Sequence, residues 1–114
     1  QYGNTDQELA ELKSQTGIDV LNISEIDNFN NIDGLTALIQ ACDHVVSVDN
    51  LTVHIAGALG KKASVLLPYA SDWRWGQKGL DSYWHASLEL LRQDKVSDWR
   101  APLAALRHDL LAHF

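Results

Sequence analysis

Helical and strand-like patterns alternate along the first two thirds of this chain, and this alternation limits the fold more than any other feature. Short apolar runs, typical of buried strands, are separated by stretches with helical spacing and capping residues. Such an order with short links is typical of a parallel sheet with right-handed crossovers. We therefore expect an α/β fold with a Rossmann-like three-layer parallel sheet. The expected strands are residues 18–23, 44–49 and 63–67, and the helices before them begin near Thr5, Asp33 and Leu51.

The first helix has a start and a stop signal. Thr5 and Glu8 have the spacing of a capping box, in which each side chain bonds the backbone of the other. Gly17 is a typical C-terminal cap. We expect the helix to end there and the polar stretch 25–31 to be a loop.

The pattern changes after Pro68. Residues 69–86 hold five aromatic side chains among polar residues and glycines, and a long irregular segment inside a compact domain is usually functional or disordered. The aromatic content argues against disorder. A last strand over 87–92 and a closing helix, with Pro102 in its first turn, complete the expected elements.

Composition excludes several classes. The net charge of −6 and the scattered basic residues argue against a nucleic-acid surface. A single cysteine, Cys42, excludes an internal disulfide and a cysteine zinc site, and we expect a buried, inert thiol. No apolar run is long enough for a membrane span, and we expect a cytoplasmic protein. The absence of methionine suggests a fragment of a longer protein, forming one domain over residues 1–114.

The second expected strand delivers polar residues to its carboxyl end, where open parallel sheets bind ligands. Asp49 and Asn50 lead directly into a helix start, which suits a phosphate group. Thr52 adds a hydroxyl and His54 follows one turn later. Asp49 would repel phosphate and would instead accept hydrogen bonds from sugar hydroxyls. Alternatively, Asp49 and Asn50 are plain caps and His54 is a structural histidine.

The small residues 56–58 of this helix would allow it to approach the sheet closely. The glycine patterns of dinucleotide-binding folds and P-loops are absent from the sequence, which excludes classical NAD binding and P-loop hydrolysis.

The aromatic segment allows two interpretations. Tyr69, Trp73 and Trp75 could form a stacking wall for a nucleobase, with Arg74 reaching a phosphate. They could equally pack down as a minor core. We interpret Trp84 and Trp99 as packing residues, the pair 61–62 as a solvated turn, and the remaining histidines, at 44, 85, 108 and 113, as structural or solvent-facing without metal-ligand spacing.

Two stretches resemble a known family. Residues 42–60, CDHVVSVDNLTVHIAGALG, are similar to the Asp-Thr-Gly-x-x-His-x-Ala-Ala-Ala-Leu-Gly signature in the C-terminal domain of the heptosyltransferase-like family 9 glycosyltransferases. Residues 65–75, VLLPYASDWRW, and the opening QYGN resemble a bacterial group in which tetratricopeptide repeats precede such a domain. The resemblance covers most of the chain.

This resemblance implies the donor-binding half of a GT-B-type glycosyltransferase, with a nucleotide sugar as substrate and neither a cofactor nor a metal. It implies that Asp49 contacts the donor sugar, that the amides of Asn50, Leu51 and Thr52 hold the diphosphate, and that His54 lies close to phosphate or sugar. Asn50 and Leu51 replace the signature threonine and glycine, and leucine restricts the backbone that glycine would free. No catalytic residue is expected here, because the general base would come from an upstream acceptor domain.

The expected partners are therefore the acceptor domain and the tetratricopeptide repeats of the same protein, and we expect the fragment alone to be inactive. An unpaired sheet edge could support a homodimer. One rival interpretation is a non-catalytic Rossmann-like scaffold beside the repeats. A flavodoxin-like or receiver-type signalling domain ranks third, because the residues around Asp49 lack the acidic cluster of a phosphoacceptor site.

Overall fold

The computed structural model describes residues 4–114, which divide into two units, and the boundary lies after Leu35, inside a helix. Each unit is described by itself. The element order is α1 (Asp6–Thr16), α2 (Ile32–Ala41), β1 (Val45–Val48), α3 (Leu51–Ala58), β2 (Ala63–Leu67), the 3₁₀ helix η1 (Trp73–Trp75), β3 (Leu88–Arg92) and α4 (Arg100–His113).

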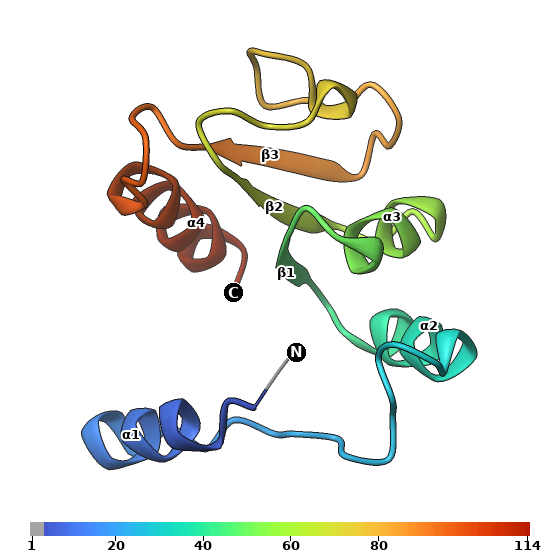
Figure 1. The fold of residues 1–114 in the computed structure, drawn as a ribbon, viewed down its shortest axis with the longest axis vertical. Coiled ribbons are helices and arrows are strands. Elements are labelled where there is room, and N and C mark those ends of the chain that lie inside the picture. The colour runs from blue at the N-terminus through green and yellow to red at the C-terminus, as the bar shows by residue number, and fades with distance from the viewer. Residues whose placement is uncertain (1–3) are drawn as a thin grey trace. The chain divides into compact units, whose positions relative to one another are not determined.

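The first unit contains α1, the irregular residues that follow it and the first turn of α2 (Figure 1). Gly17 ends α1 with φ 71°, as predicted, and its N–H donates to the carbonyl of Lys13. The predicted capping box is wrong, because the Thr5 side chain makes no capping hydrogen bond. Asn4 Oδ1 accepts from the N–H of Asp6 at 3.1 Å instead, so the neighbouring residue caps this helix start.

The strand predicted over residues 18–23 does not form. Ile18, Val20 and Leu21 are 58%, 44% and 84% exposed, so the apolar run is not buried. A strand needs a neighbouring strand to satisfy its backbone groups, and in the described part of the chain the sheet contains only β1, β2 and β3. The sequence pattern shows that these residues are apolar, but it could not show whether a neighbouring strand is available to pair with them.

The second unit is built on a three-stranded parallel sheet in the order β1-β2-β3. Val45 pairs with Ala63, and Ala63 pairs with Leu88, so the strands start in register. The central strand β2 is almost completely buried, which explains why its sequence is continuously apolar. The predicted parallel sheet is confirmed for these strands, with boundaries within one residue.

Helices cover both faces of this sheet, α3 against β1 and β2, and α4 against β3 (Figure 1). Side chains alternate between faces along a strand, so Ser64 and Glu89 share one face, and the buried Val65 and Leu90 share the other. Pro102 lies in the first turn of α4, as predicted. The fold is thus mixed α/β with a small parallel sheet, compatible with a Rossmann-like fragment.

The two edges of the sheet differ. The outer edge of β3 is covered, because Asp81 forms an antiparallel bridge with Glu89 and the N–H of Leu90 donates to the carbonyl of Leu80 at 2.7 Å. At the other edge, β1 is the last strand in the described residues, and Val46 and Val48 are 43% and 49% exposed.

Candidate functional site: an aromatic cleft beside α3

A cavity of about 320 Å³ lies between α3, η1 and the residues that lead into β3. It joins three predicted site residues to two that the sequence analysis had assigned to packing or structure. We call it the aromatic cleft, and it is lined by His54, Trp73, Arg74, Trp84 and His85.

His54 connects the aromatic cleft to the carboxyl end of β1. Its ring stacks on Trp75, with 5.2 Å between centroids and an interplanar angle of 22°. Its Nε2 lies 4.0 Å from Oδ1 of Asp49, and both side chains are about one third exposed. Trp75 is completely buried, so it forms a rigid support under the imidazole. The structure therefore brings Asp49, His54 and Trp75 together.

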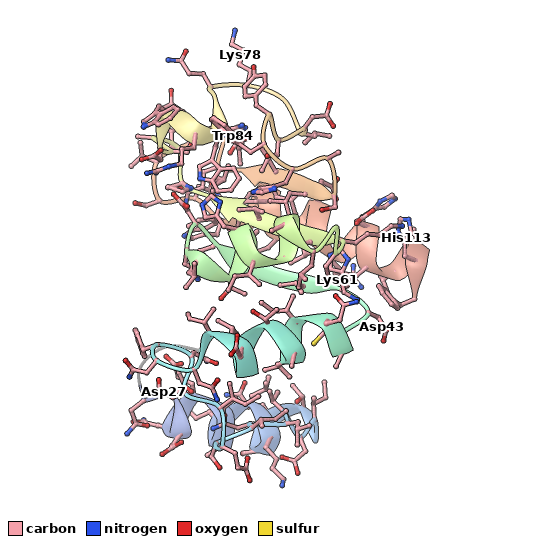
Figure 2. The ribbon with its side chains drawn as sticks, turned by 90° about the vertical axis from the view of Figure 1, so that its right-hand side faces the viewer. Asp27, Asp43, Lys61, Lys78, Trp84 and His113 are labelled. Carbon is pink, nitrogen blue, oxygen red and sulfur yellow. The ribbon has the colours of Figure 1, made fainter. Side chains whose placement is uncertain are left out.

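Two tryptophans form the exposed walls of the cleft. Trp73 and Trp84 are 73% and 59% exposed, and their rings meet edge to face at 6.3 Å and 78°. Nε1 of Trp84 donates to the carbonyl of Arg74 at 3.0 Å, which fixes the indole against η1 (Figure 2). Trp84 therefore packs against η1, as predicted, but it is not buried and also lines the cleft. Of the two interpretations of the aromatic segment, the minor core applies to Trp75, which is buried, and the exposed wall applies to Trp73.

Arg74 brings a positive charge to the cleft. Its guanidinium makes an ion pair with Asp72 at 2.9 Å and lies 5.5 Å from the centre of the Trp73 ring. Oδ1 of Asp72 also accepts from the N–H of Arg74 at 3.0 Å, so one aspartate caps η1 and orients the side chain. A guanidinium has five N–H donors, which leaves capacity for an anionic ligand.

His85 reaches the cleft because α3 has a glycine where the chain crosses it. A Cβ on Gly57 would lie 2.3 Å from Cγ of His85. The small residues 56–58 therefore have two roles. Ala56 is completely buried, and Gly57 makes room for His85. The contact with His85 was not predicted. Burial, and then the charge of His54, lower the pKa of His85 below its usual value. The sequence signal for this contact was a glycine in mid-helix.

The start of α3 is already capped. Oδ1 of Asn50 accepts from the N–H of Thr52 at 3.0 Å, and its Nδ2 donates to Oγ of Ser47 at 3.0 Å. The plain-cap alternative therefore holds for Asn50, although it does not hold for Asp49, whose carboxylate faces His54. Leu51 is the first helical residue and is 48% exposed. Asn50, Leu51 and Thr52 do not line the aromatic cleft.

Some predicted residues lie elsewhere. Tyr69 is 60% exposed and does not line the cleft, and its N–H donates to Oε1 of Gln93 at 3.0 Å. Lys61 is not simply solvated, because its Nζ donates to the carbonyls of Gln40 and Cys42 at 3.0 and 2.8 Å and so caps the end of α2 (Figure 2). Cys42 is a free, half-buried thiol and not a fully buried one.

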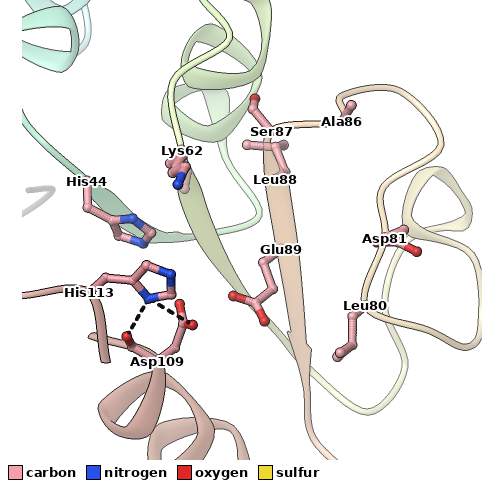
Figure 3. A pocket seen from close by; sticks show the side chains of 11 residues that line it. His44, Lys62, Leu80, Asp81, Ala86, Ser87, Leu88, Glu89, Asp109 and His113 are labelled. Atoms are coloured by element: carbon pink, nitrogen blue, oxygen red, sulfur yellow. Dashed lines mark hydrogen bonds and ion pairs between the residues drawn. The ribbon is translucent and has the colours of Figure 1, made fainter. Parts of the chain in front are cut away.

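A second cavity of about 360 Å³ lies at the amino ends of the strands (Figure 3). Glu89 and Asp109 face each other in it, and Nδ1 of His113 lies 3.4 Å from Oδ1 of Asp109. On the same side, Nε2 of His44 lies 2.9 Å from Oγ of Ser64. We favour the aromatic cleft as the site, because open parallel sheets bind ligands beyond the carboxyl ends of their strands.

Within residues 4–114, no group of three or more histidine, cysteine, aspartate or glutamate side chains is arranged to hold a metal ion. Over the same residues, none of the helices combines the length and the apolar character that crossing a bilayer demands.

Comparison with known proteins gives one informative likeness. The chain is 29% identical over 100 residues to Protein FlbA of Caulobacter vibrioides, and the match covers 87% of this chain and 16% of FlbA. The chain thus spans less than one fifth of the length of that protein. No family model matches the sequence, and no solved structure matches the fold.

Proposed function

We propose that this chain is the donor-binding half of a GT-B-type glycosyltransferase similar to family 9, and that the aromatic cleft holds a nucleoside diphosphate sugar. The observation that carries the proposal is the content of the cleft. Two indoles, a guanidinium and two imidazoles surround about 320 Å³, which is within the range of small-molecule sites. Aromatic faces suit a nucleobase, and cationic donors suit a diphosphate.

The geometry of the tryptophans limits how a base can bind. Because the rings of Trp73 and Trp84 are nearly perpendicular, they cannot sandwich a planar base. A base would stack on one indole face and meet the edge of the other. Arg74 already lies near the Trp73 ring, so the exposed face of Trp84 is the better platform.

The diphosphate would be held mainly by side chains. In the predicted arrangement the amides of residues 50–52 bind phosphate, but Asn50 already accepts the Thr52 amide. Arg74, His54 and His85 all line the cleft and could donate to phosphate oxygens. As the sugar-phosphate bond breaks, such donors would stabilise the charge that develops on the leaving diphosphate.

The sugar would extend toward Asp49. Its carboxylate is close to His54 and accessible, so it could accept hydrogen bonds from sugar hydroxyls. The acceptor and its general base would come from another domain of the same protein, as the resemblance implies. On this proposal the 114-residue chain binds the donor and does not transfer it.

The test is a titration of the 114-residue chain with a panel of nucleoside diphosphates and nucleotide sugars, followed by tryptophan fluorescence. We expect Trp84→Ala to weaken binding about fivefold or more, because stacking on an aromatic side chain contributes about 1–3 kcal/mol per base. Trp99→Ala, which removes an indole outside the cleft, should leave the affinity unchanged. Asp49→Ala should weaken a nucleotide sugar while its nucleoside diphosphate still binds.

One observation favours the rival scaffold function. Asn50 occupies the first-turn amide that a phosphate would use, and Leu51 stands where the signature has glycine. If the folded chain binds no member of the panel, the donor proposal is refuted and a non-catalytic Rossmann-like scaffold becomes the better account. In that case β1, as the last described strand of the sheet, would be the first surface to test for dimerisation.

A further inference from the structure

Two polar residues at the carboxyl end of β3 hold the segment that carries the wall of the aromatic cleft. Arg92 is the last residue of β3, and Gln93 follows it. Neither was among the predicted site residues. Together they bond five places on the crossing segment between β2 and β3, over residues 69–79.

The Arg92 guanidinium is the centre of this arrangement. Nε donates to the carbonyl of Gly79 at 2.9 Å. Nη1 donates to the carbonyl of Gly76 and to the side-chain Oγ of Ser71, each at 3.2 Å. Nη2 donates to the carbonyl of Trp75. One planar side chain thus gathers four acceptors from a nine-residue stretch.

Gln93 fixes the beginning of the same segment. Gln93 is 6% exposed, and its Oε1 accepts from the N–H of Tyr69, two residues after the end of β2, at 3.0 Å. Its own N–H donates to the carbonyl of Leu67 at 3.0 Å, so its backbone continues the ladder. The segment is therefore tied at its start by Gln93 and along its length by Arg92.

Such ties matter because, apart from the 3₁₀ helix η1, the segment has no regular secondary structure. Gly76 and Gly79 have φ of 65° and 92°, and the carbonyls that Arg92 collects belong to a turn without strand or α-helical bonding. Irregular backbone of this kind opens easily unless its polar groups are paired. A lysine could not replace the guanidinium, because its single ammonium group cannot reach acceptors spread around a planar fork.

We propose that Arg92 and Gln93 are positioning residues of the aromatic cleft, which hold residues 71–79 so that Trp73 and Arg74 face the ligand. The part that concerns affinity depends on the proposed nucleotide-sugar function. The part that concerns the order of the segment does not, and it can be measured without any ligand. Burial lowers the pKa of Arg92, in agreement with a guanidinium withdrawn among protein groups.

The ligand-free test is amide hydrogen exchange of the 114-residue chain, read by peptides that cover residues 69–84 and, separately, β1 and β2. We expect Arg92→Lys to raise exchange over 71–79 about tenfold while β1 and β2 stay protected. Ser71→Ala removes one of the four Arg92 contacts and should have a smaller effect in the same place. Arg107→Lys, on the exposed surface of α4, is the matched control.

The ligand test asks whether the order of residues 71–79 determines affinity, and continued protection of β1 and β2 excludes general destabilisation. Adenosine diphosphate and uridine diphosphate are titrated beside inorganic pyrophosphate. Because Arg74, which would hold the diphosphate, lies in the segment that Arg92 holds, positioning predicts that Arg92→Lys weakens both pyrophosphate and the better of the two nucleotides, the nucleotide about tenfold. Unchanged exchange over 71–79, or raised exchange there with unchanged affinity for the ligands that the parent chain binds, overturns the proposal. Raised exchange in a protein that binds no nucleotide supports the positioning role and refutes the donor function.

Discussion

Replacement of Gly57 by alanine tests whether His85, which lines the aromatic cleft, lies against α3 as the structure places it. In an exposed helix this change would stabilise the protein by about 1 kcal/mol, because glycine is the poorer helix former. Here the new Cβ would lie 2.3, 2.6 and 2.7 Å from Cγ, Cδ2 and Cβ of His85. These atoms are close to the His85 backbone, so rotation of the ring cannot relieve the clash.

The expected magnitude follows from two opposed terms. Carbon atoms in ordinary contact are about 3.5–4.0 Å apart, so the segment around His85 would have to retreat by more than about 1 Å. Overpacking of this kind costs about 1–3 kcal/mol, which exceeds or equals the gain in helix propensity. We therefore expect Gly57→Ala to lower the free energy of unfolding by up to about 2 kcal/mol and to open the cleft.

The assay is urea unfolding of four proteins in a double-mutant cycle: the parent chain, Gly57→Ala, His85→Gly and the double variant. Without the His85 side chain the clash disappears, so Gly57→Ala should then stabilise the fold by about 1 kcal/mol. Ala105→Gly, in the exposed middle of α4, measures the alanine–glycine difference without a neighbour. A stabilising Gly57→Ala in the parent chain would refute the contact and, with it, this wall of the cleft.

Three further changes test separate parts of the structure. Asn50→Ala should lower the free energy of unfolding by about 1 kcal/mol in thermal or urea unfolding, because the Thr52 amide loses its cap; no loss would show that the cap is dispensable and the amide available to a phosphate. Glu89→Gln should stabilise the fold at pH 7 and not at pH 4. Burial raises the pKa of Glu89, so the free energy of unfolding falls as the pH rises from 4.5 through the pKa of the folded state. Equal effects of the substitution at both pH values would contradict this. Leu21→Ser should change the free energy of unfolding by less than about 0.5 kcal/mol, whereas Leu90→Ala should cost about 2–5 kcal/mol, and a large loss from Leu21→Ser would mean that the predicted strand forms after all.

The predictable part of the fold is the part whose signals are local. β1, β2 and the helix between them were placed correctly because continuous apolar runs, an asparagine cap and a terminal glycine each act within a few residues. The same reasoning failed at residues 18–23, where the outcome depends on a distant ladder partner. It failed again at Thr5, because two adjacent residues compete for one cap and Asn4 takes it.

The candidate site divides along the same line. The position of Asp49 and His54 beyond β1 followed from topology, and their proximity is found in the structure. The sequence Trp-Arg-Trp could not show which of its two tryptophans turns inward. A 3₁₀ turn places neighbouring residues on different sides, and only tertiary packing selects the one that is buried. Trp84 and His85 were missed because they approach α3 from another part of the chain.

Asn50 and Leu51 differ from the threonine and glycine of the family 9 signature, and under the proposed function these differences affect how an anion is held. An asparagine cap satisfies a helix amide permanently, and leucine removes the backbone freedom that lets a loop wrap a phosphate. Both changes make the helix start more stable and less available. An anion in the neighbouring cleft would then depend on the two imidazoles and on Arg74, which lies in the segment that Arg92 holds. On the proposed function, donor affinity therefore depends on side chains and not on backbone amides, and it should be more sensitive to pH and to single substitutions than an amide site would be.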